Sequence, residues 1–227
     1  MMDKPQLIVM LTQHDQTVKY AREIFEECKD SKATVWGLKE KGLPKEDMKA
    51  LFSYMKDCGK TTVLEVVAYT EEACIDGAKT AVDCGCDILM GTVFFDSVNR
   101  FCREHQLKYM PFVGAIHGRP SVLSGSIEDI LAQAQTYLDQ GVFGLDLLGY
   151  RYTGDPLALI GSLTSRIRAP ICIAGSINSY DRLDEIKRLS PWAFTIGGGF
   201  FEHRFGDSLR EQIDRVWDYI ADYAVEK

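Results

Sequence analysis

The sequence predicts one (β/α)8 barrel, a TIM barrel of eight parallel strands spanning residues 1–227. Short apolar runs alternate with helical patterns eight times, with no long linker or low-complexity segment between them. The strand-like runs are apolar throughout, which is typical of a parallel sheet covered by helices. An open doubly wound sheet is the alternative, but eight uninterrupted units favour a closed sheet.

The predicted strands follow one another at similar intervals. They cover residues 7–11, 33–38, 61–67, 86–90, 109–115, 144–148, 170–174 and 192–197. The first predicted helix has apolar residues at helical spacing, namely Val18, Ala21, Ile24, Phe25 and Cys28. The last has Leu209, Ile213, Val216, Trp217 and Ile220 on one face.

Several residues mark helix ends. Pro44 is expected to open the second helix in its first turn. Ser126 is expected to cap the fifth helix, and Gly141 to end it. The pair Cys84 and Cys86 has no second Cys/His pair at zinc spacing, so we interpret the segment as a helix end entering a strand, with the glycine between them as the C-cap.

Composition narrows the function classes. The net charge of −7 argues against a nucleic-acid surface or an anionic membrane partner. No apolar run approaches about 18–20 residues and the amino-terminal residues have no apolar signal-peptide region, so neither a membrane span nor a signal peptide is expected. The seven cysteines, an odd number and mostly within apolar patterns, favour a reducing cytoplasm.

Two glycine-bearing segments follow the last two predicted strands. They are Ala174-Gly175-Ser176-Ile177-Asn178 and Ile196-Gly197-Gly198-Gly199-Phe200. Strand–glycine–helix units expose backbone N–H groups that hold phosphate, and strands seven and eight are where barrels usually bind it. The phosphate-binding candidates are Gly175, Ser176, Gly197 and Gly198, with Asn178 or Ser179 capping the next helix. The alternative is a pair of tight turns that need glycine.

Chemistry in this fold lies at the carboxyl ends of the strands. The first strand is followed by Thr12-Gln13-His14-Asp15 and the fifth by His117-Gly118-Arg119. The catalytic candidates at the strand ends are Glu65, Lys39, Asp146 and His117, and the substrate-binding candidates are Gln13, Thr92 and Arg151. Carboxylates between apolar strand residues are costly to bury unpaired, so Glu65 and Asp146 need a partner or a function.

These candidates have structural alternatives. Glu65 and Lys39 are alternatively a structural ion pair, Lys39 a solvated loop residue and His117 a capping residue. His14, Glu65, His117 and Asp146 are single residues on different strands without a ligand-spacing rule, so no metal and no cofactor is expected.

In these segments the chain resembles the ribulose-phosphate-binding barrels, whose two phosphate loops are similar to residues 170–178 and 192–198. Residues 144–150, 153–156 and 37–44 are similar to segments of N-acetylmannosamine-6-phosphate 2-epimerases. That family's catalytic glutamate before the strand-seven glycine is replaced by Ala174, and its strand-three lysine has no match.

A second resemblance, to 2-keto-3-deoxy-6-phosphogluconate aldolases, rests on residues 64–67 and 91–93 and implies that Glu65 is an acid/base. That family's Schiff-base lysine belongs on strand six, where this chain has Asp146. The chain therefore matches the full catalytic set of neither family.

The resemblance implies an enzyme acting on a small phosphorylated sugar or keto acid. The leading hypothesis is isomerisation or epimerisation by proton abstraction next to a carbonyl, with Glu65 as base, Asp146 as second acid/base and Lys39 stabilising the oxyanion. An aldolase-type lyase using Lys39 as an atypical Schiff-base lysine is one alternative. A non-catalytic phosphosugar-binding protein is the other, and a homo-oligomeric state is left open.

Overall fold

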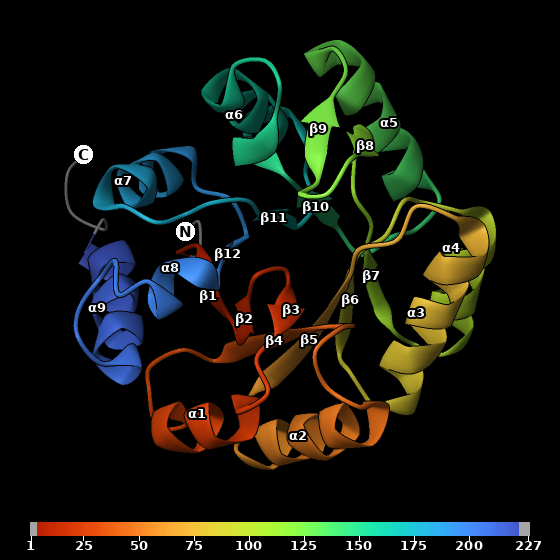
Figure 1. The fold of residues 1–227 in the computed structure, drawn as a ribbon. Helices are drawn as coiled ribbons and strands as arrows, with labels where there is room; N and C mark the ends of the chain where they lie inside the picture. The colour runs from red at the N-terminus through yellow and green to blue at the C-terminus, as the bar shows by residue number, and fades with distance from the viewer. Residues whose placement is uncertain (1–3, 223–227) are drawn as a thin grey trace.

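Eight parallel strands surround a central axis in the computed structural model, which describes residues 4–222 (Figure 1). They are β1 Gln6–Met10, β4 Val35–Lys39, β5 Thr61–Val66, β6 Ile88–Gly91, β7 Lys108–Met110, β10 Leu145–Leu147, β11 Ile171–Ile173 and β12 Ala193–Ile196. Their hydrogen-bonded order is β10-β11-β12-β1-β4-β5-β6-β7, and a parallel bridge between Phe112 and Asp146 closes the ring. The predicted (β/α)8 barrel is confirmed.

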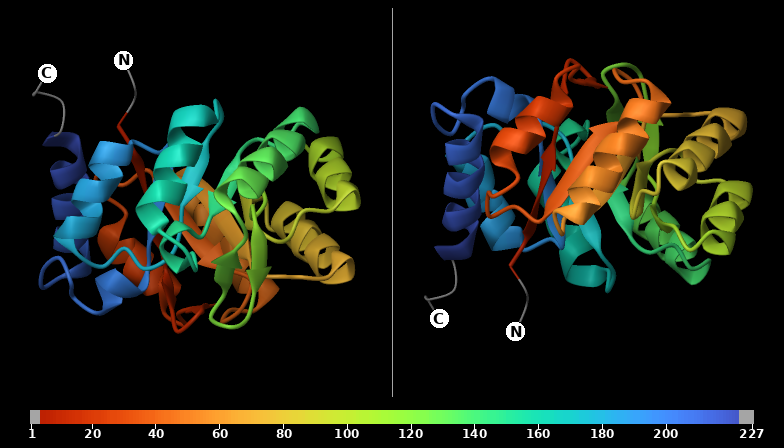
Figure 2. Two further views of the ribbon diagram at one scale, coloured as in Figure 1. Left: turned by 90° about the horizontal axis from the view of Figure 1, so that it is seen from above. Right: turned by 90° about the horizontal axis from the view of Figure 1, so that it is seen from below.

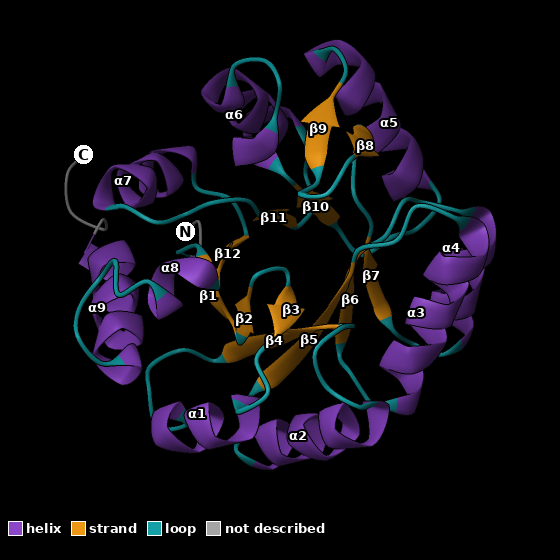
Figure 3. Ribbon diagram, in the orientation of Figure 1, coloured by secondary structure: helices purple, strands orange, loops and turns teal. Residues whose placement is uncertain are grey.

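Helices cover the outside of this ring (Figure 3). They are α1 Ala21–Cys28, α2 Lys45–Asp57, α3 Glu71–Asp83, α4 Asp96–Glu104, α5 Ile127–Asp139, α6 Pro156–Arg166, α7 Tyr180–Leu189, α8 Gly198–Phe201 and α9 Leu209–Ala221, with a 3-10 turn η1 at Gly149–Arg151. The Ser126 hydroxyl accepts from the Asp129 N–H and caps α5, as predicted. Ser179 caps α7 in the same way.

Two local predictions about helix ends have different outcomes. Pro44 lies one position before the first turn, and α2 begins at Lys45. Proline suits either place, because neither needs its missing N–H. The segment Cys84-Gly85-Cys86 does end α3, and Gly85 has φ +68°, as a glycine after a helix end commonly has.

The core has two parts because side chains alternate between the two faces of each strand. One set fills the inside of the ring: Ile8, Met10, Val35, Val63, Ile88, Met90, Met110, Cys172 and Ala193. The larger set, which includes Trp36, Leu64 and Phe194, packs between strands and helices. Lys39 and Glu65 continue the inward series of β4 and β5 and are paired in register, so both reach the carboxyl end of the ring interior.

Two short hairpins were not predicted. β2 (Thr12–Gln13) pairs with β3 (Gln16–Thr17), and β8 (Ala115–His117) pairs with β9 (Val122–Ser124). Both project from the same end of the barrel, side by side in the two views of Figure 2. These hairpins add residues to the end of the barrel where the strands finish.

The predicted strand 109–115 is therefore wrong in extent. β7 ends at Met110, and His117 belongs to the β8–β9 hairpin. Pro111 has no N–H to continue the ladder, and Gly114, at φ +87°, turns the chain away from the ring.

The expected absence of a signal peptide rests partly on residues 1–3, which lie outside the described residues. Within residues 4–222, no helix is long and apolar enough to cross a membrane. All seven cysteines are free.

Candidate active site

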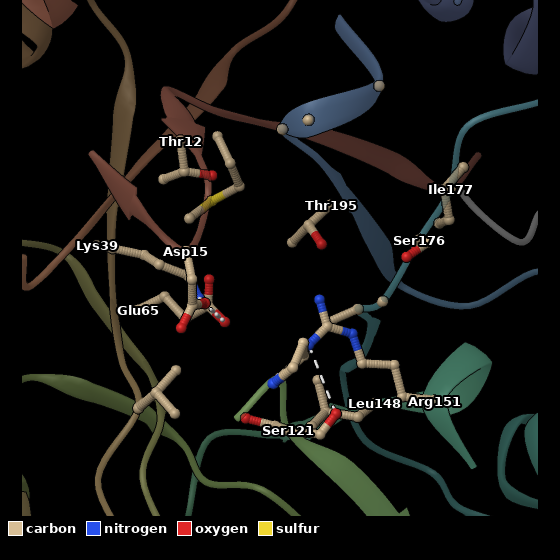
Figure 4. A pocket seen from close by; sticks show the side chains of 18 of the residues that line it. Thr12, Asp15, Lys39, Glu65, Ser121, Leu148, Arg151, Ser176, Ile177 and Thr195 are labelled. Atoms are coloured by element: carbon tan, nitrogen blue, oxygen red, sulfur yellow. Dashed lines mark hydrogen bonds and ion pairs between the residues drawn. The ribbon is translucent and has the colours of Figure 1, made fainter. Parts of the chain in front are cut away.

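A cavity of about 550 Å³ opens at the carboxyl ends of the strands (Figure 4). Eight of the residues singled out from the sequence line it: Gln13, Lys39, Glu65, Arg151, Gly175, Ser176, Gly197 and Gly198. In Figure 4, Lys39, Asp15 and Glu65 lie on one side of the pocket, and Ser176 and Ile177 on the other. A bound molecule would therefore meet charged side chains at one end and the glycine loops at the other.

Lys39 and Glu65 form an ion pair across the neighbouring strands β4 and β5. The Lys39 Nζ lies 3.5 Å from Glu65 Oε1, and the two side chains are only 11% and 13% exposed. The Lys39–Glu65 ion pair that the sequence suggested as a structural alternative is thus present, but both side chains line the cavity. The alternative of Lys39 as a solvated loop residue is wrong.

Asp15 is a second carboxylate on Lys39. It lies at the tip of the β2–β3 hairpin, where His14 and Asp15 both have positive φ. Its Oδ1 accepts a hydrogen bond from Lys39 Nζ, and its Oδ2 lies 3.6 Å from Arg119 Nη1 on the other hairpin. Asp15 therefore bridges two cations at the mouth of the pocket.

The two carboxylates control the protonation of Lys39. Burial alone would lower the pKa of the Lys39 ammonium, but the negative charge of Glu65 and the hydrogen bond to Asp15 outweigh it and raise that pKa. Lys39 is therefore a protonated donor that can stabilise a developing negative charge.

The glycine loops form the opposite wall. Gly175 has φ +125°, and a Cβ on Gly197 would lie 2.6 Å from Thr12 Oγ1, so local geometry requires glycine at both positions. A Cβ on Gly199 would lie 3.0 Å from the carbonyl oxygen of Ile177, which shows that the two loops touch.

Gly198 differs from these glycines. A Cβ there would meet only Glu202 Oε1 at 3.8 Å, so geometry does not demand glycine, yet the residue lines the pocket. Among the described residues, the N–H groups of Ser176, Gly198 and Gly199 have no backbone or side-chain acceptor. Because α8 has only four residues, these individual donors matter more than its dipole.

The charges near the loops also suit an anion. Arg151, from η1, points into the pocket and lies between the two walls in Figure 4, where its Nη1 donates to the Ser121 carbonyl at 3.5 Å. Within residues 4–222 no carboxylate lies within 4.0 Å of Arg151. Glu202 also lines this end, and its carboxylate is paired with Arg204 at 3.0 Å. Arg151 is thus the cation left for a bound anion.

Asp146 lies outside the cavity, beneath its floor. It is 0% exposed, and neither of its carboxylate oxygens has a hydrogen-bond partner among the described residues. Burial raises the pKa of Asp146 well above its usual 3.8, the charge of Glu65 raises it further, and Lys39 opposes the shift. Burial therefore favours the protonated form of Asp146, which lies beneath the Lys39–Glu65 ion pair.

This buried carboxyl makes stability depend on pH. Its pKa is higher in the folded than in the unfolded chain, so its stabilising effect is full below the ordinary pKa of 3.8 and is lost as the pH rises toward the raised value. We expect Asp146→Asn to flatten this loss, which reaches about 1.4 kcal/mol per pH unit. Urea unfolding of both proteins at about pH 5 and about pH 8 measures it. If the free energy of unfolding falls equally between the two pH values in the wild type and in Asp146→Asn, the raised pKa does not belong to Asp146.

Two other candidates are not brought into the cavity. Thr92 is fully buried at φ +63°, and its hydroxyl is 2.6 Å from the Tyr109 hydroxyl, on the outer side of the strands. His117 is exposed on the β8–β9 hairpin and does not line the pocket. Among residues 4–222, no three His, Cys, Asp or Glu side chains gather as a metal site would require.

Sequence reasoning did not assign Asp15 and Arg119 to the site. The signal for Asp15 is the palindromic run Thr-Gln-His-Asp-Gln-Thr, in which two turn-compatible residues separate matching polar pairs. Arg119 is anchored by a 2.8 Å hydrogen bond from its Nη2 to the Val67 carbonyl, a contact that depends on the folded hairpin.

No family model matches the sequence, and no curated protein matches it. Solved structures do resemble it. A native KDPGal structure aligns with TM-score 0.71 and 13% identity, over 97% of this chain and 97% of that one. The N-acetylmannosamine-6-phosphate 2-epimerase from Clostridium perfringens aligns with TM-score 0.64 and 12% identity, over 87% and 88%.

The orotidine 5'-phosphate decarboxylase from Pyrococcus horikoshii OT3 aligns with TM-score 0.68 and 13% identity, over 95% of this chain and 99% of that one. At such identities the likeness shows the fold alone. The resemblance to ribulose-phosphate-binding barrels is thus confirmed as a shared architecture, which does not fix the reaction.

Proposed function

We propose that this protein is an enzyme that isomerises or epimerises a phosphorylated sugar by removing a proton next to a carbonyl group. The observation that carries the proposal is the Lys39–Glu65 pair, which faces the unpaired N–H groups of two loops across one cavity. A carboxylate base beside a protonated donor suits enolisation, and free amides suit a phosphate.

Each group has a defined part in this reaction. Glu65 takes the proton from the carbon, and the electron pair of that C–H bond forms the carbon–carbon double bond of an enediolate. Negative charge then develops on the carbonyl oxygen, where the Lys39 ammonium stabilises it. Return of the proton to the former carbonyl carbon, with transfer of the adjacent hydroxyl proton to the former carbonyl oxygen, gives an isomer. An epimer forms when a second proton donor, on the other face, protonates the original carbon and Glu65 keeps the proton it removed.

Asp146 was expected to be a second acid/base, and we propose a different role for it. Since it lies beneath the floor of the cavity, we assign it as a positioning residue acting through Glu65 and Lys39. Gln13 and Arg151 line the pocket and are proposed to bind substrate, whereas Thr92 and His117 lie outside it.

The aldolase alternative requires Lys39 as a nucleophile. A Schiff-base lysine needs an unprotonated amine, and its pKa is usually depressed for that purpose. Here Glu65 and Asp15 raise the pKa of Lys39, which disfavours amine attack. Borohydride trapping with a keto-acid phosphate tests this directly, and a covalent adduct on Lys39 would favour the lyase.

A thermal-shift panel tests the proposed ligand class. Phosphorylated ketoses, amino sugars and keto acids are compared with their unphosphorylated parents. A ligand at about 100 times its dissociation constant adds roughly 2.7 kcal/mol to the stability, which is a clear shift. We expect only phosphorylated compounds to stabilise the protein, and equal effects of the unphosphorylated parents would contradict the proposal. Binding without conversion would indicate a non-catalytic phosphosugar-binding protein. The cytoplasmic location and any homo-oligomeric state stay predictions from the sequence.

A further inference from the structure

The end of the pocket that faces the glycine loops already contains an anion supplied by the protein. Asp15 hydrogen-bonds Lys39 through one carboxylate oxygen, and its other oxygen lies 3.6 Å from Arg119 Nη1. Its side chain is 41% exposed at the pocket mouth. It therefore occupies the place that a carboxylate of a ligand would take between the two cations.

The hairpin holds this carboxylate in place. The Lys39 N–H donates to Thr17 Oγ1 at 2.8 Å, and the same hydroxyl donates to the Lys39 carbonyl at 2.9 Å. A Cβ on Gly42 would lie 2.0 Å from the Thr17 carbonyl oxygen, so the loop after β4 packs directly against the hairpin. These contacts hold the base of the hairpin against the end of β4, so Asp15 is presented beside Lys39.

The charges at this end are balanced. Among the described residues that line it, Lys39 and Arg119 face Asp15 and Glu65. The cation without a carboxylate partner, Arg151, is set between this end and the glycine loops in Figure 4. A ligand with one phosphate matches this distribution, and a second negative group would meet Asp15 and Glu65.

We propose that Asp15 is a specificity-determining residue that excludes ligands with a carboxylate at the end opposite their phosphate. This inference rests on the proposed function, because it assumes that the phosphate binds at the glycine loops. The preferred substrate is then a monophosphate whose other end is an uncharged carbonyl or hydroxyl group. A keto-acid phosphate is disfavoured by the charges of the pocket.

A matched pair of ligands tests the proposal by calorimetric titration. Glycerol 3-phosphate has an uncharged end, and 3-phosphoglycerate has a carboxylate there. We expect the wild-type protein to bind 3-phosphoglycerate at least about tenfold more weakly. Asp15→Asn is expected to tighten 3-phosphoglycerate by about tenfold or more and glycerol 3-phosphate by less than about threefold. Asparagine tolerates positive φ, so the turn is kept.

Asp57→Asn is the matched control. It makes the same change in net charge on an exposed residue, the last of α2. The chain there enters the amino-terminal end of β5, at the end of the barrel away from the pocket. This variant should leave the ratio of the two affinities unchanged. The inference alone fails if glycerol 3-phosphate binds and Asp15→Asn leaves the ratio at its wild-type value. If inorganic phosphate and both ligands fail to bind every variant, the proposed function fails and the inference with it.

Discussion

Replacing Glu65 by glutamine is expected to lower turnover by roughly 10²–10⁴-fold, because it removes the base that takes the proton from carbon. The substrate is the compound identified by the ligand panel. Glutamine keeps the size of the side chain, and Lys39 keeps Asp15 as a charged partner, so the fold should be retained. Steady-state kinetics measures the loss, and urea unfolding measures the stability.

Glu40→Gln is a suitable comparison for this variant. Glu40 is the next residue after β4, is half-buried, and does not line the cavity. Its replacement removes a nearby carboxylate without removing the proposed base, so turnover should stay within about threefold of wild type. Wild-type turnover in Glu65→Gln would exclude Glu65 as the base.

Replacing Gly198 by aspartate is expected to weaken phosphate-ester binding by at least about 100-fold, to the point where thermal shifts disappear. The new carboxylate would occupy the N–H-lined wall and lie close to Glu202, so a phosphate would face two negative groups. The backbone accepts the change, since a Cβ at this position has no heavy atom closer than 3.8 Å and φ is not positive.

Gly198→Asn separates charge from size. Asparagine has nearly the same shape as aspartate and no charge, so it should retain much more phosphate affinity than Gly198→Asp. If both variants lose affinity equally, the effect is steric. If Gly198→Asp binds like the wild type, the phosphate does not lie at these loops.

The barrel was predictable because its signals are local. Apolar runs, helical periodicity and capping residues such as Ser126 and Ser179 depend on near neighbours in the chain, and the structure confirms them. The glycine loops were equally visible, and the structure distinguishes Gly198, which has room for a side chain, from Gly197, which has none.

The rest of the site depends on contacts between distant segments. The strands of the β2–β3 hairpin have two residues each, and their turn contains no glycine. Two residues are too few to show the alternating apolar pattern by which a strand is predicted. Asp146 was recognised as a buried carboxylate, but its sequence neighbours cannot show that it lies beneath the pocket and outside it. That distinction depends on where β10 sits in the ring.

The closure of the ring also has a dynamic consequence. β7 and β10 contribute three residues each, and one parallel bridge, from Phe112 to Asp146, pairs residues across the boundary between them. Backbone hydrogen bonds from the Asp146 N–H to the Pro111 carbonyl and from the Phe143 and Gly144 N–H groups to the Tyr109 carbonyl also cross it. This boundary has fewer paired residues than any other boundary between neighbouring strands of the ring, so local opening of the barrel is expected to begin there. Opening at this boundary would expose Asp146, whose pKa is raised by burial in the closed ring, and ionised Asp146 would oppose reclosing. At alkaline pH the barrel should therefore open between β7 and β10 before the whole chain unfolds.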